Sequence, residues 1–455
     1  MKNQRLTRGL AGLAVASLIA AACGGSDESS DSTDAPTTDP APTESAGEPE
    51  PAPEPADGEA VELDFSTWAN PAEEAAFNTI IANYEAANPN VTVNLDVTPP
   101  PPDYTNQVDV ALAGGTAPDI VRGGFVGMII NWAKADGVID LAPYLEDGFT
   151  DDYQSPALNL MSFDGSPHAL PLHQDTIGLF YNKKYFEEAG LTPPATGEEC
   201  WDRDTFLDNS TNLIDNTDAE IGFSHFYNNG KRYLSMVFDN GGQLYNDELS
   251  ASQFNEAAAI ETIEWTQRWF DEGHVSDGNT MKGSDDILTL FSSGRAAMMM
   301  HGFFIMPSLA DQMDPAEWGV THLPCSMRSG ADVGGTGIAV TRDAENPEVA
   351  ADFVKFLTSA ESQAIFAADA LFIPTRQSVI DAGMTWSSFQ TEMEFFANEV
   401  MPLINPDQAV TMAQPTFPGI NGAMANEIEL AWTSGQSAED TAANIAAAVD
   451  EALAG

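Results

Sequence analysis

Residues 61–97, VELDFSTWANPAEEAAFNTIIANYEAANPNVTVNLDV, carry the strongest structural signal in the chain. Apolar and polar residues alternate over 61–66, which predicts a strand with one buried face. Apolar residues then recur at helical spacing after Pro71, and Asn88-Pro89 ends the predicted helix. Alternation returns over 91–97 and predicts a second strand. Strand, helix and strand in this order form a βαβ unit, which implies a parallel sheet covered by helices.

The same succession of strands and helices continues along the chain, and we find no internal repeat. Further strands are predicted at 178–181 and 296–300, and further helices at 257–270, 347–358 and 438–453. A length of 455 residues suggests two or three domains or one two-lobed unit. The predicted fold class is therefore α/β.

The first 22 residues form a targeting segment. Lys2, Arg5 and Arg8 precede an uncharged run that is too short to span a bilayer, and Ala20-Ala21-Ala22-Cys23 follows. Small residues before a lone cysteine resemble a bacterial lipobox, although Ala20 replaces the usual Leu. The resemblance predicts a signal peptide over 1–22 and lipidation of Cys23; the alternative is an ordinary cleavage site beside a cysteine.

Residues 23–60 are predicted to be a disordered, acidic tether. They are rich in Pro, Ser, Thr and acidic residues, and they contain no aromatic and no large aliphatic side chain. Such a segment cannot bury enough apolar surface to fold. Its expected role is to hold the folded part away from the membrane surface.

The charge balance is strongly acidic, with 17 Lys and Arg against 70 Asp and Glu and a formal net charge of −53. Nucleic acid is excluded as a partner, because phosphate neutralisation requires Lys and Arg. The acidity predicts a solubilising surface, of the kind that suits salt or acid, with a polycation-binding surface as the alternative.

Two cysteines remain in the predicted folded part, Cys200 and Cys325. In an oxidising compartment they form either a disulfide or two buried thiols, because sequence does not give the distance between their Cα atoms. Neither cysteine belongs to a zinc-ligand pattern, and the six histidines share no helix at metal-ligand spacing. We predict no metal and no cofactor.

Several segments, taken in their order along the chain, resemble those of the extracellular solute-binding proteins of ABC importers, the group that contains the maltose receptors. The segments are YEAANPNVTV (84–93), AGGTAPDIV (113–121), LFYNKKYFEEAGL (179–191), GRAAM (294–298), GGTGIAV (334–340) and FVKFL (353–357). The resemblance implies two α/β lobes around a ligand cleft, built from 61–173 plus 330–373 and from 174–329 plus 374–455. Strands crossing between the lobes are expected near 173–178, 330–335 and 372–376, and closure on ligand would be a hinge motion.

The candidate ligand-binding residues combine aromatic faces with fixed polar groups, as a sugar site requires. Trp68 ends the first strand, where α/β sheets place ligands, Asp175 lies at the first crossing, and Phe304 replaces a tryptophan frequent in sugar-binding relatives. The other candidates are Phe303, Gly334, Gly335, Arg376 and Phe417. The structural alternatives are packing for Trp68, a solvated loop for Asp175 and a plain turn for the two glycines, which would otherwise let the backbone approach the ligand or act as a hinge. Phe303 is the alternative to Phe304. Tyr181, Asn182 and Asp119 are interpreted as mainly structural.

The predicted function is that of an exported, monomeric substrate-binding lipoprotein on the outer face of the cytoplasmic membrane. It would deliver a mono- or oligosaccharide to the permease of an ABC transporter. A polyamine or another non-sugar solute is the alternative ligand. An extracellular glycoside hydrolase is the less favoured alternative, since the sequence contains no HExxH, G-x-S-x-G or Walker A motif.

Overall fold

The computed structural model describes residues 59–101, 103–124, 127–195, 197, 200–328 and 330–454. The predicted signal peptide, Cys23 and nearly all of the predicted tether lie outside the described residues. The predicted βαβ unit is confirmed, because the first two strands are parallel neighbours joined by a helix. The further predicted strands and helices are also confirmed within one or two residues of their bounds.

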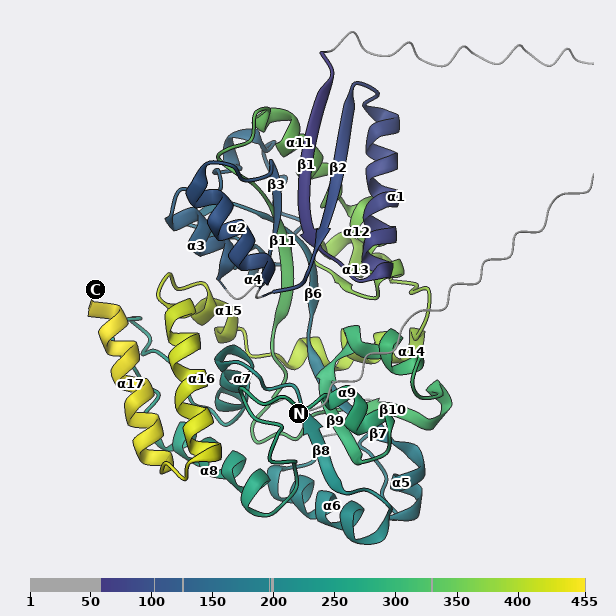
Figure 1. Ribbon diagram of the computed structural model, residues 1–455, viewed down its shortest axis with the longest axis vertical. Coiled ribbons are helices and arrows are strands. Elements are labelled where there is room, and N and C mark those ends of the chain that lie inside the picture. The colour runs from purple at the N-terminus through teal and green to yellow at the C-terminus, as the bar shows by residue number, and fades with distance from the viewer. Residues whose placement is uncertain are drawn as a thin grey trace, which may run out of the picture. The chain divides into compact units, whose positions relative to one another are not determined.

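A six-stranded sheet in the order β12-β6-β11-β3-β1-β2 forms the upper half of Figure 1. β1 is parallel to β2 and β3, whereas β11 is antiparallel to β3 and β6. The strands are β1 (Val61–Trp68), β2 (Val91–Thr98), β3 (Ile120–Gly124), β6 (Leu170–Asp175), β11 (Gly334–Val340) and β12 (Ile373–Pro374). The helices beside this sheet are α1 (Pro71–Ala87), α2 (Asp103–Gly114), α3 (Met128–Lys134), α4 (Ser155–Asn159), α11 (Pro347–Leu357), α12 (Ala360–Ala370) and α13 (Gln377–Ala382).

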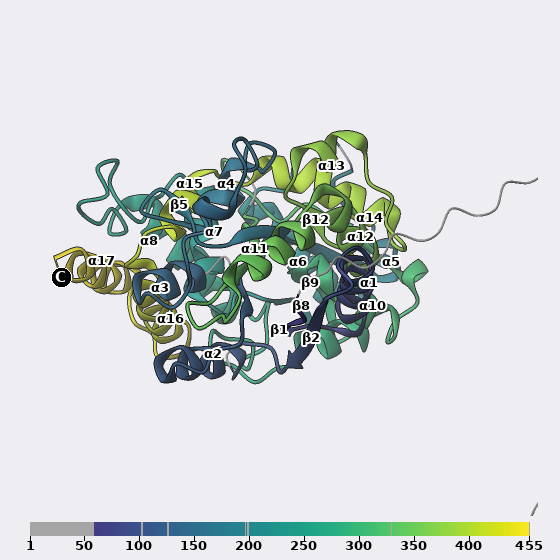
Figure 2. The same ribbon diagram turned by 90° about the horizontal axis from the view of Figure 1, so that it is seen from above.

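A four-stranded sheet in the order β10-β7-β9-β8 forms the lower half of Figure 1. Its strands are β7 (Ile177–Asn182), β8 (Ile221–His225), β9 (Ala296–Gly302) and β10 (Trp318–Thr321). The remaining α-helices are α5 (Lys183–Glu188), α6 (Arg203–Asn216), α7 (Gly230–Asp239), α8 (Ala257–Asp271), α9 (Ile287–Ser292), α10 (Met306–Ala310), α14 (Gln390–Phe395), α15 (Asp407–Met412), α16 (Phe417–Thr433) and α17 (Ala438–Ala454). Viewed from above, α16 and α17 lie at one side and α5 and α14 at the other (Figure 2).

A two-stranded pair and five short helical turns make up the remaining elements of the described residues. β4 (Ser162–Phe163) pairs with β5 (Ser166–Pro167). The short helical turns are η1 (Ala142–Tyr144), η2 (Phe303–Ile305), η3 (Pro315–Glu317), η4 (Phe396–Val400) and η5 (Met401–Leu403). Within the described ranges, no helix combines the length and the apolar character that crossing a membrane requires.

Local sequence explains where α1 begins and ends. Asn70 caps it by accepting hydrogen bonds from the backbone of Ala72 and Glu73, and the Glu73 carboxylate accepts the Asn70 N–H in return. Asn88 forms the other end, as predicted. The buried face of α1 carries Phe77 and Tyr84 against the sheet and α11. Glu73, in the first turn of α1, also lines a cavity at the junction of the two sheets.

The chain passes between the two sheets three times. β6 ends in the large sheet at Asp175 and β7 begins in the small sheet at Ile177. After β10 the chain passes from the small sheet back to the large sheet, which it enters at the start of β11. The third passage differs from the expected 372–376: β12 pairs with β6 and α13 packs on α12, so the chain reaches the small sheet only after α13.

Residues interpreted as structural have structural contacts. The Asp119 carboxylate accepts backbone N–H groups of Asp64 and Glu345, and the Asn182 side chain caps α5 at Tyr185. Of the two alternatives left open for the cysteines, the structure contains the disulfide. Cys200 and Cys325 are bonded, with their Cα atoms 5.9 Å apart.

Candidate ligand site

A cavity of about 1000 Å³ lies where the two sheets meet, and we call it the front cavity. It is lined from the large sheet by Trp68, Arg122, His173 and Asp175, and from the elements of the small sheet by Arg232 and Phe304, among others. Trp68 is the last residue of β1, and Arg122 is the middle residue of β3, whose last residue, Gly124, also lines the cavity. These are the carboxyl ends of parallel strands, where open α/β sheets bind ligands.

Arg122 ties the large-sheet wall of this cavity together. Its guanidinium donates to the Trp68 carbonyl at 2.7 Å, to the Thr336 hydroxyl at 3.0 Å and to the Glu73 carboxylate at 2.8 Å. The same group lies 4.4 Å from the centre of the Trp68 ring. One buried side chain therefore links β1, β3, β11 and α1, and it fixes both the backbone and the ring of Trp68.

His173 completes this network as a neutral ring. Its Nε2 lies 2.8 Å from an Arg122 nitrogen and 2.9 Å from the Thr336 hydroxyl. Because arginine can only donate, Nε2 accepts and the ring carries no proton there. Burial, reinforced by the nearby Arg122 charge, holds the pKa of His173 well below its ordinary value. His173 is therefore uncharged at physiological pH.

A second cluster of charges lies at the junction of the two lobes. Lys231 Nζ is 2.7 Å from Asp332 Oδ2, and Arg232 Nε is 3.7 Å from the same oxygen. Asp332 is fully buried just before β11, and Lys231 is only 5% exposed in the first turn of α7. Burial by itself would raise the pKa of Asp332, but the two cations lower it overall. Asp332 is therefore ionised, and the cluster joins a crossing segment to α7.

Among the described residues, two carboxylates line the front cavity without a salt bridge: the exposed Asp109, which accepts a hydrogen bond from Trp132 Nε1 at 2.7 Å, and Asp175. Burial raises the pKa of Asp175 to about 6, against the opposing charges of Lys231, Arg232 and Arg122, while Asp332 adds to the rise. Gly334 is its neighbour across the β6–β11 ladder, and a Cβ at Gly334 would collide with the Asp175 carboxylate. The absence of a side chain at Gly334 therefore leaves room for Asp175 in the cavity.

Aromatic faces line both sides of the cavity. Trp68 packs against Tyr104 on the large-sheet side, with ring centroids 4.9 Å apart. On the other side, Phe226 stacks on His301 at 4.3 Å, carries the Arg232 guanidinium 4.2 Å above its ring and meets Phe304 edge-on. Such faces match the apolar C–H faces of a flat, polar ligand.

Five of the eight sequence candidates meet in this cavity: Trp68, Asp175, Phe304, Gly334 and Gly335. The two glycines belong to β11 rather than to a turn, and Gly335 has a φ of +141°, a conformation that favours glycine.

The other three candidates lie outside the lining of the front cavity. Phe303 is fully buried against Phe396, with ring centroids 5.2 Å apart. Arg376 is buried elsewhere, donating to the Thr358 carbonyl at 2.7 Å under the ring of Tyr153. Phe417 is buried in the core, although its neighbour Pro418 lines the cavity.

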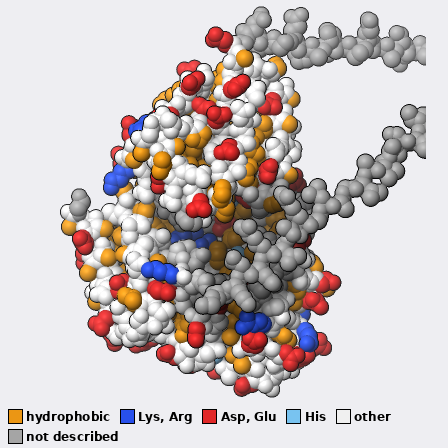
Figure 3. All heavy atoms as spheres, in the orientation of Figure 1, with side chains coloured by type: hydrophobic (Ala, Val, Ile, Leu, Met, Phe, Trp, Pro, Cys, Tyr) orange, Lys and Arg blue, Asp and Glu red, His pale blue; other side chains and the backbone are white. Residues whose placement is uncertain are grey.

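Sequence reasoning missed the cations of the site, Arg122, Lys231 and Arg232. Lysine and arginine are scarce in this chain, and Lys231-Arg232 is its one Lys–Arg neighbour pair, preceded by Asn-Asn-Gly. The small number of Lys and Arg residues was therefore the one signal in the sequence that could have drawn attention to Lys231 and Arg232. Figure 3 shows acidic side chains spread over the visible face and few cations, with one group of cations at mid-height. Among the described residues, no group of His, Cys, Asp and Glu is placed to hold a metal ion.

Asp175→Asn should raise stability and weaken binding at the same time. Since the pKa of Asp175 is raised by folding, its ionisation costs stability as pH rises from about 4 through 6. At pH 7.5 we expect the free energy of unfolding of the variant to be about 1–3 kcal/mol higher than that of the native chain. This gain in stability should vanish near pH 4. Urea titrations at both pH values measure this.

The control is Asp247→Asn at an exposed position, for which no such difference between the two pH values is expected. Loss of a charged hydrogen-bond acceptor should also weaken ligand binding by about 10- to 100-fold. An Asp175→Asn protein that is less stable at pH 7.5, or whose stability follows pH as the native chain does, would contradict the assignment.

Comparisons with known proteins agree with this architecture. The lactose-binding protein of Rhizobium radiobacter is 25% identical over 395 residues, covering 82% of this chain and 87% of the relative. The maltotriose-binding protein of Pyrococcus abyssi is 24% identical over 326 residues, covering 69% and 67%. The structure of the GacH receptor of Streptomyces glaucescens, solved unliganded and with acarbose, covers 87% of this chain and 99% of the receptor, with 21% identity and a TM-score of 0.73.

Two sheets joined by three passages, with a cavity at their junction, define a two-lobed ligand-binding protein of the maltose-binding type. The model of the family described as bacterial extracellular solute-binding protein matches residues 68–364. The chain belongs to this family, whose members serve as the solute-binding proteins of ABC transporters.

Proposed function

We propose that the chain captures a neutral mono- or oligosaccharide in the front cavity and delivers it to the permease of an ABC importer. The observation that carries this proposal is the pairing of an unbridged carboxylate with aromatic faces. Asp175 offers an acceptor for sugar hydroxyls, Arg232 offers donors, and Trp68 and Phe304 offer surfaces for the ring. Relatives that bind lactose, maltotriose and multiple sugars support the same ligand class.

The charges around the cavity argue for a neutral ligand. Glu73 is paired with Arg122, and Asp332 is paired with Lys231. Of the other charged lining residues, Asp175 and Arg232 offset one another, and the exposed Asp109 accepts a hydrogen bond from Trp132 Nε1. A polyamine would bring at least two positive charges close to the Arg232 guanidinium, and this repulsion disfavours it.

We also propose which segments form the two lobes and how the chain is anchored to the membrane. The lobes are those expected from the sequence, 61–173 plus 330–373 and 174–329 plus 374–455, with the border after 373 moved beyond α13, because β12 and α13 pack with the first lobe. They close over the sugar by a hinge motion. Cys23 carries the lipid that holds a monomeric chain at the outer face of the cytoplasmic membrane. The protein binds its sugar without hydrolysing it, and incubation with chromogenic glycosides should release no dye.

A thermal-shift screen of the full chain tests the ligand class. Lactose, maltose and maltotriose are compared with spermidine and a tripeptide. A ligand at 100 times its Kd stabilises by about 2.7 kcal/mol. We expect at least one sugar to raise the melting temperature and spermidine to leave it unchanged. The reverse result would show that the carbohydrate proposal is wrong.

Two substitutions then locate the site. Trp68→Ala and Phe304→Ala should each remove the sugar-induced shift while the unliganded protein still unfolds cooperatively, because both side chains are only partly buried. Phe163→Ala is the control, at another partly buried phenylalanine in the β4–β5 pair. A sugar shift that survives in both Trp68→Ala and Phe304→Ala would place the ligand elsewhere.

A further inference from the structure

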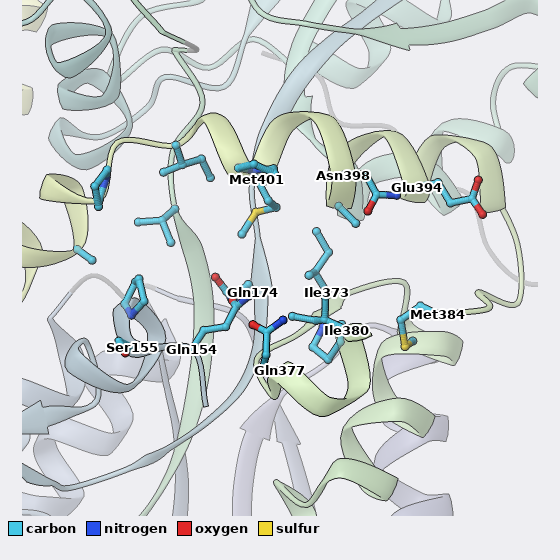
Figure 4. A pocket seen from close by; sticks show the side chains of 18 of the residues that line it. Gln154, Ser155, Gln174, Ile373, Gln377, Ile380, Met384, Glu394, Asn398 and Met401 are labelled. Atoms are coloured by element: carbon cyan, nitrogen blue, oxygen red, sulfur yellow. The ribbon is translucent and has the colours of Figure 1, made fainter. Parts of the chain in front are cut away.

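A second cavity of about 770 Å³ borders the same crossing strands, and we call it the rear cavity. Figure 4 shows it between a helical segment that carries Met401, Asn398 and Glu394 and an opposite wall with Ser155, Gln377 and Ile380. Its size falls in the range of cavities that hold small molecules.

Neighbouring residues of the crossing strands line the two cavities in turn. On β6, His173 and Asp175 line the front cavity and Gln174 lines the rear one. Phe372 lines the front cavity and Ile373 the rear one. Because successive side chains of a strand point to opposite faces, the end of β6 separates the two cavities, with β11 bordering the front cavity and β12 the rear one. A change in the spacing of these walls is therefore felt on both faces.

Three glutamine side chains converge at the centre of the rear cavity: Gln154, Gln174 and Gln377 (Figure 4). Gln174 Nε2 donates to Gln154 Oε1, and Gln377 Nε2 donates to Asp381 at 2.7 Å. The side-chain atoms Gln154 Nε2, Gln174 Oε1 and Gln377 Oε1 have no protein partner among the described residues. They offer one donor and two acceptors to a neutral polar group, although Gln174 is only 3% exposed.

The rest of the lining is mostly apolar and carries little charge. Met401, Met384, Ile373 and Ile380 lie around the glutamines. Among the described lining residues there is no Lys or Arg, and their one charged side chain, Glu394, is exposed at the far end in Figure 4. A charged head group at the glutamines would find no counter-ion and would lose its hydration, so an uncharged amphipathic molecule fits best.

The walls of the rear cavity belong to different halves of the fold. α13 packs on α12 and β12 of the large sheet, whereas α14, which continues into η4 and η5, packs on β10 of the small sheet. If the two halves rotate about the strands between the cavities, narrowing the front cavity moves these rear walls apart. A molecule that contacts both rear walls at their present spacing opposes that rotation.

We propose that the rear cavity is a second ligand site, which takes an uncharged amphipathic small molecule and, by resisting closure, weakens binding in the front cavity. The site itself stands independently of the front ligand, and its coupling rests on the proposed sugar-binding function. Since coupling between sites is reciprocal, the front ligand must weaken the rear ligand by the same factor.

Octanamide is the probe, because its head group both donates and accepts, and octanoate and octylammonium are its charged counterparts. Ligand-observed NMR with the full chain should show saturable octanamide binding, with at least tenfold weaker binding of both ions. Met401→Trp should fill the cavity and weaken octanamide at least tenfold. Leu403→Trp, two residues away at a 41% exposed position outside the lining, should leave it unchanged.

The coupling is measured with the sugar that gives the largest thermal shift. Saturating octanamide should raise the sugar's Kd at least about fivefold, and Met401→Trp should abolish this rise. An unchanged sugar Kd would overturn the coupling, and a lack of saturable octanamide binding, or equal binding of the ions, would overturn the site. If no tested sugar binds at all, the proposed function fails, while octanamide and Met401→Trp still decide the rear site.

Discussion

Replacing Lys231 by Met should lower the free energy of unfolding by about 3–5 kcal/mol. The substitution leaves the Asp332 carboxylate, whose side chain is 1% exposed, without its partner at 2.7 Å. Arg232 remains 3.7 Å away and cannot replace a direct ion pair. Loss of the Lys231 charge also raises the pKa of Asp175, so less of that carboxylate is ionised at neutral pH and sugar affinity should fall. Urea unfolding and sugar titration measure the two effects.

A variant in which both Lys231 and Asp332 are replaced by apolar residues distinguishes the effect of lost packing from the effect of an unpaired buried charge. The double variant Lys231→Met with Asp332→Leu removes both charges and should recover most of the lost stability, because no unpaired ion stays buried. Lys355→Met is the control: its ion pair with Glu146 is at the surface, where the Glu146 side chain is 69% exposed, and less than about 1 kcal/mol is expected. A double variant no more stable than Lys231→Met would show that packing dominates.

Removing the disulfide should cost about 2–5 kcal/mol. The Cys200–Cys325 bond closes a loop across 125 positions, and a long loop loses much chain entropy in the unfolded state when it is closed. The bond also supports local pairing, since the Cys325 N–H donates to the Trp201 carbonyl at 2.9 Å. Cys200→Ser with Cys325→Ser should therefore unfold at a lower urea concentration than the native chain.

Reduction provides the matched comparison. Dithiothreitol should shift the unfolding of the native chain toward that of the double serine variant and should leave the variant unchanged. A native chain that unfolds identically with and without the reductant, in the absence of residual oxidised protein by mass, would contradict a stabilising role for the bond.

The fold could be predicted where local pattern decides it. Alternation over 61–66 and 91–97 and the helix between Pro71 and Asn88 reappear as β1, β2 and α1. The third passage was misplaced because β12 has two residues, and its pairing with β6 depends on strands about 200 positions apart. The cysteine pairing stayed open for the same reason: the distance between two Cα atoms is a property of the whole fold.

The candidate site was predictable only in part. Trp68 and Asp175 follow from their places at strand ends, where the sheet presents them to the cavity. Phe417 shows the limit of such reasoning: neighbouring residues of a helix point about 100° apart, so Phe417 is buried while Pro418 lines the cavity. The Lys231–Asp332 pair was out of reach, because it joins segments about 100 positions apart and neither belongs to a motif.

The separation of two cavities by alternate residues of β6 constrains how related chains can diverge. A substitution at 173, 174 or 175 would change the lining of one cavity only. The ligand preferences of the front and rear cavities can therefore evolve independently. Insertion of a single residue there would exchange the two faces, sending His173 and Asp175 rearward and Gln174 forward. Homologues should therefore vary in composition along this strand but not in length, whereas loops at the outer rims are free to grow.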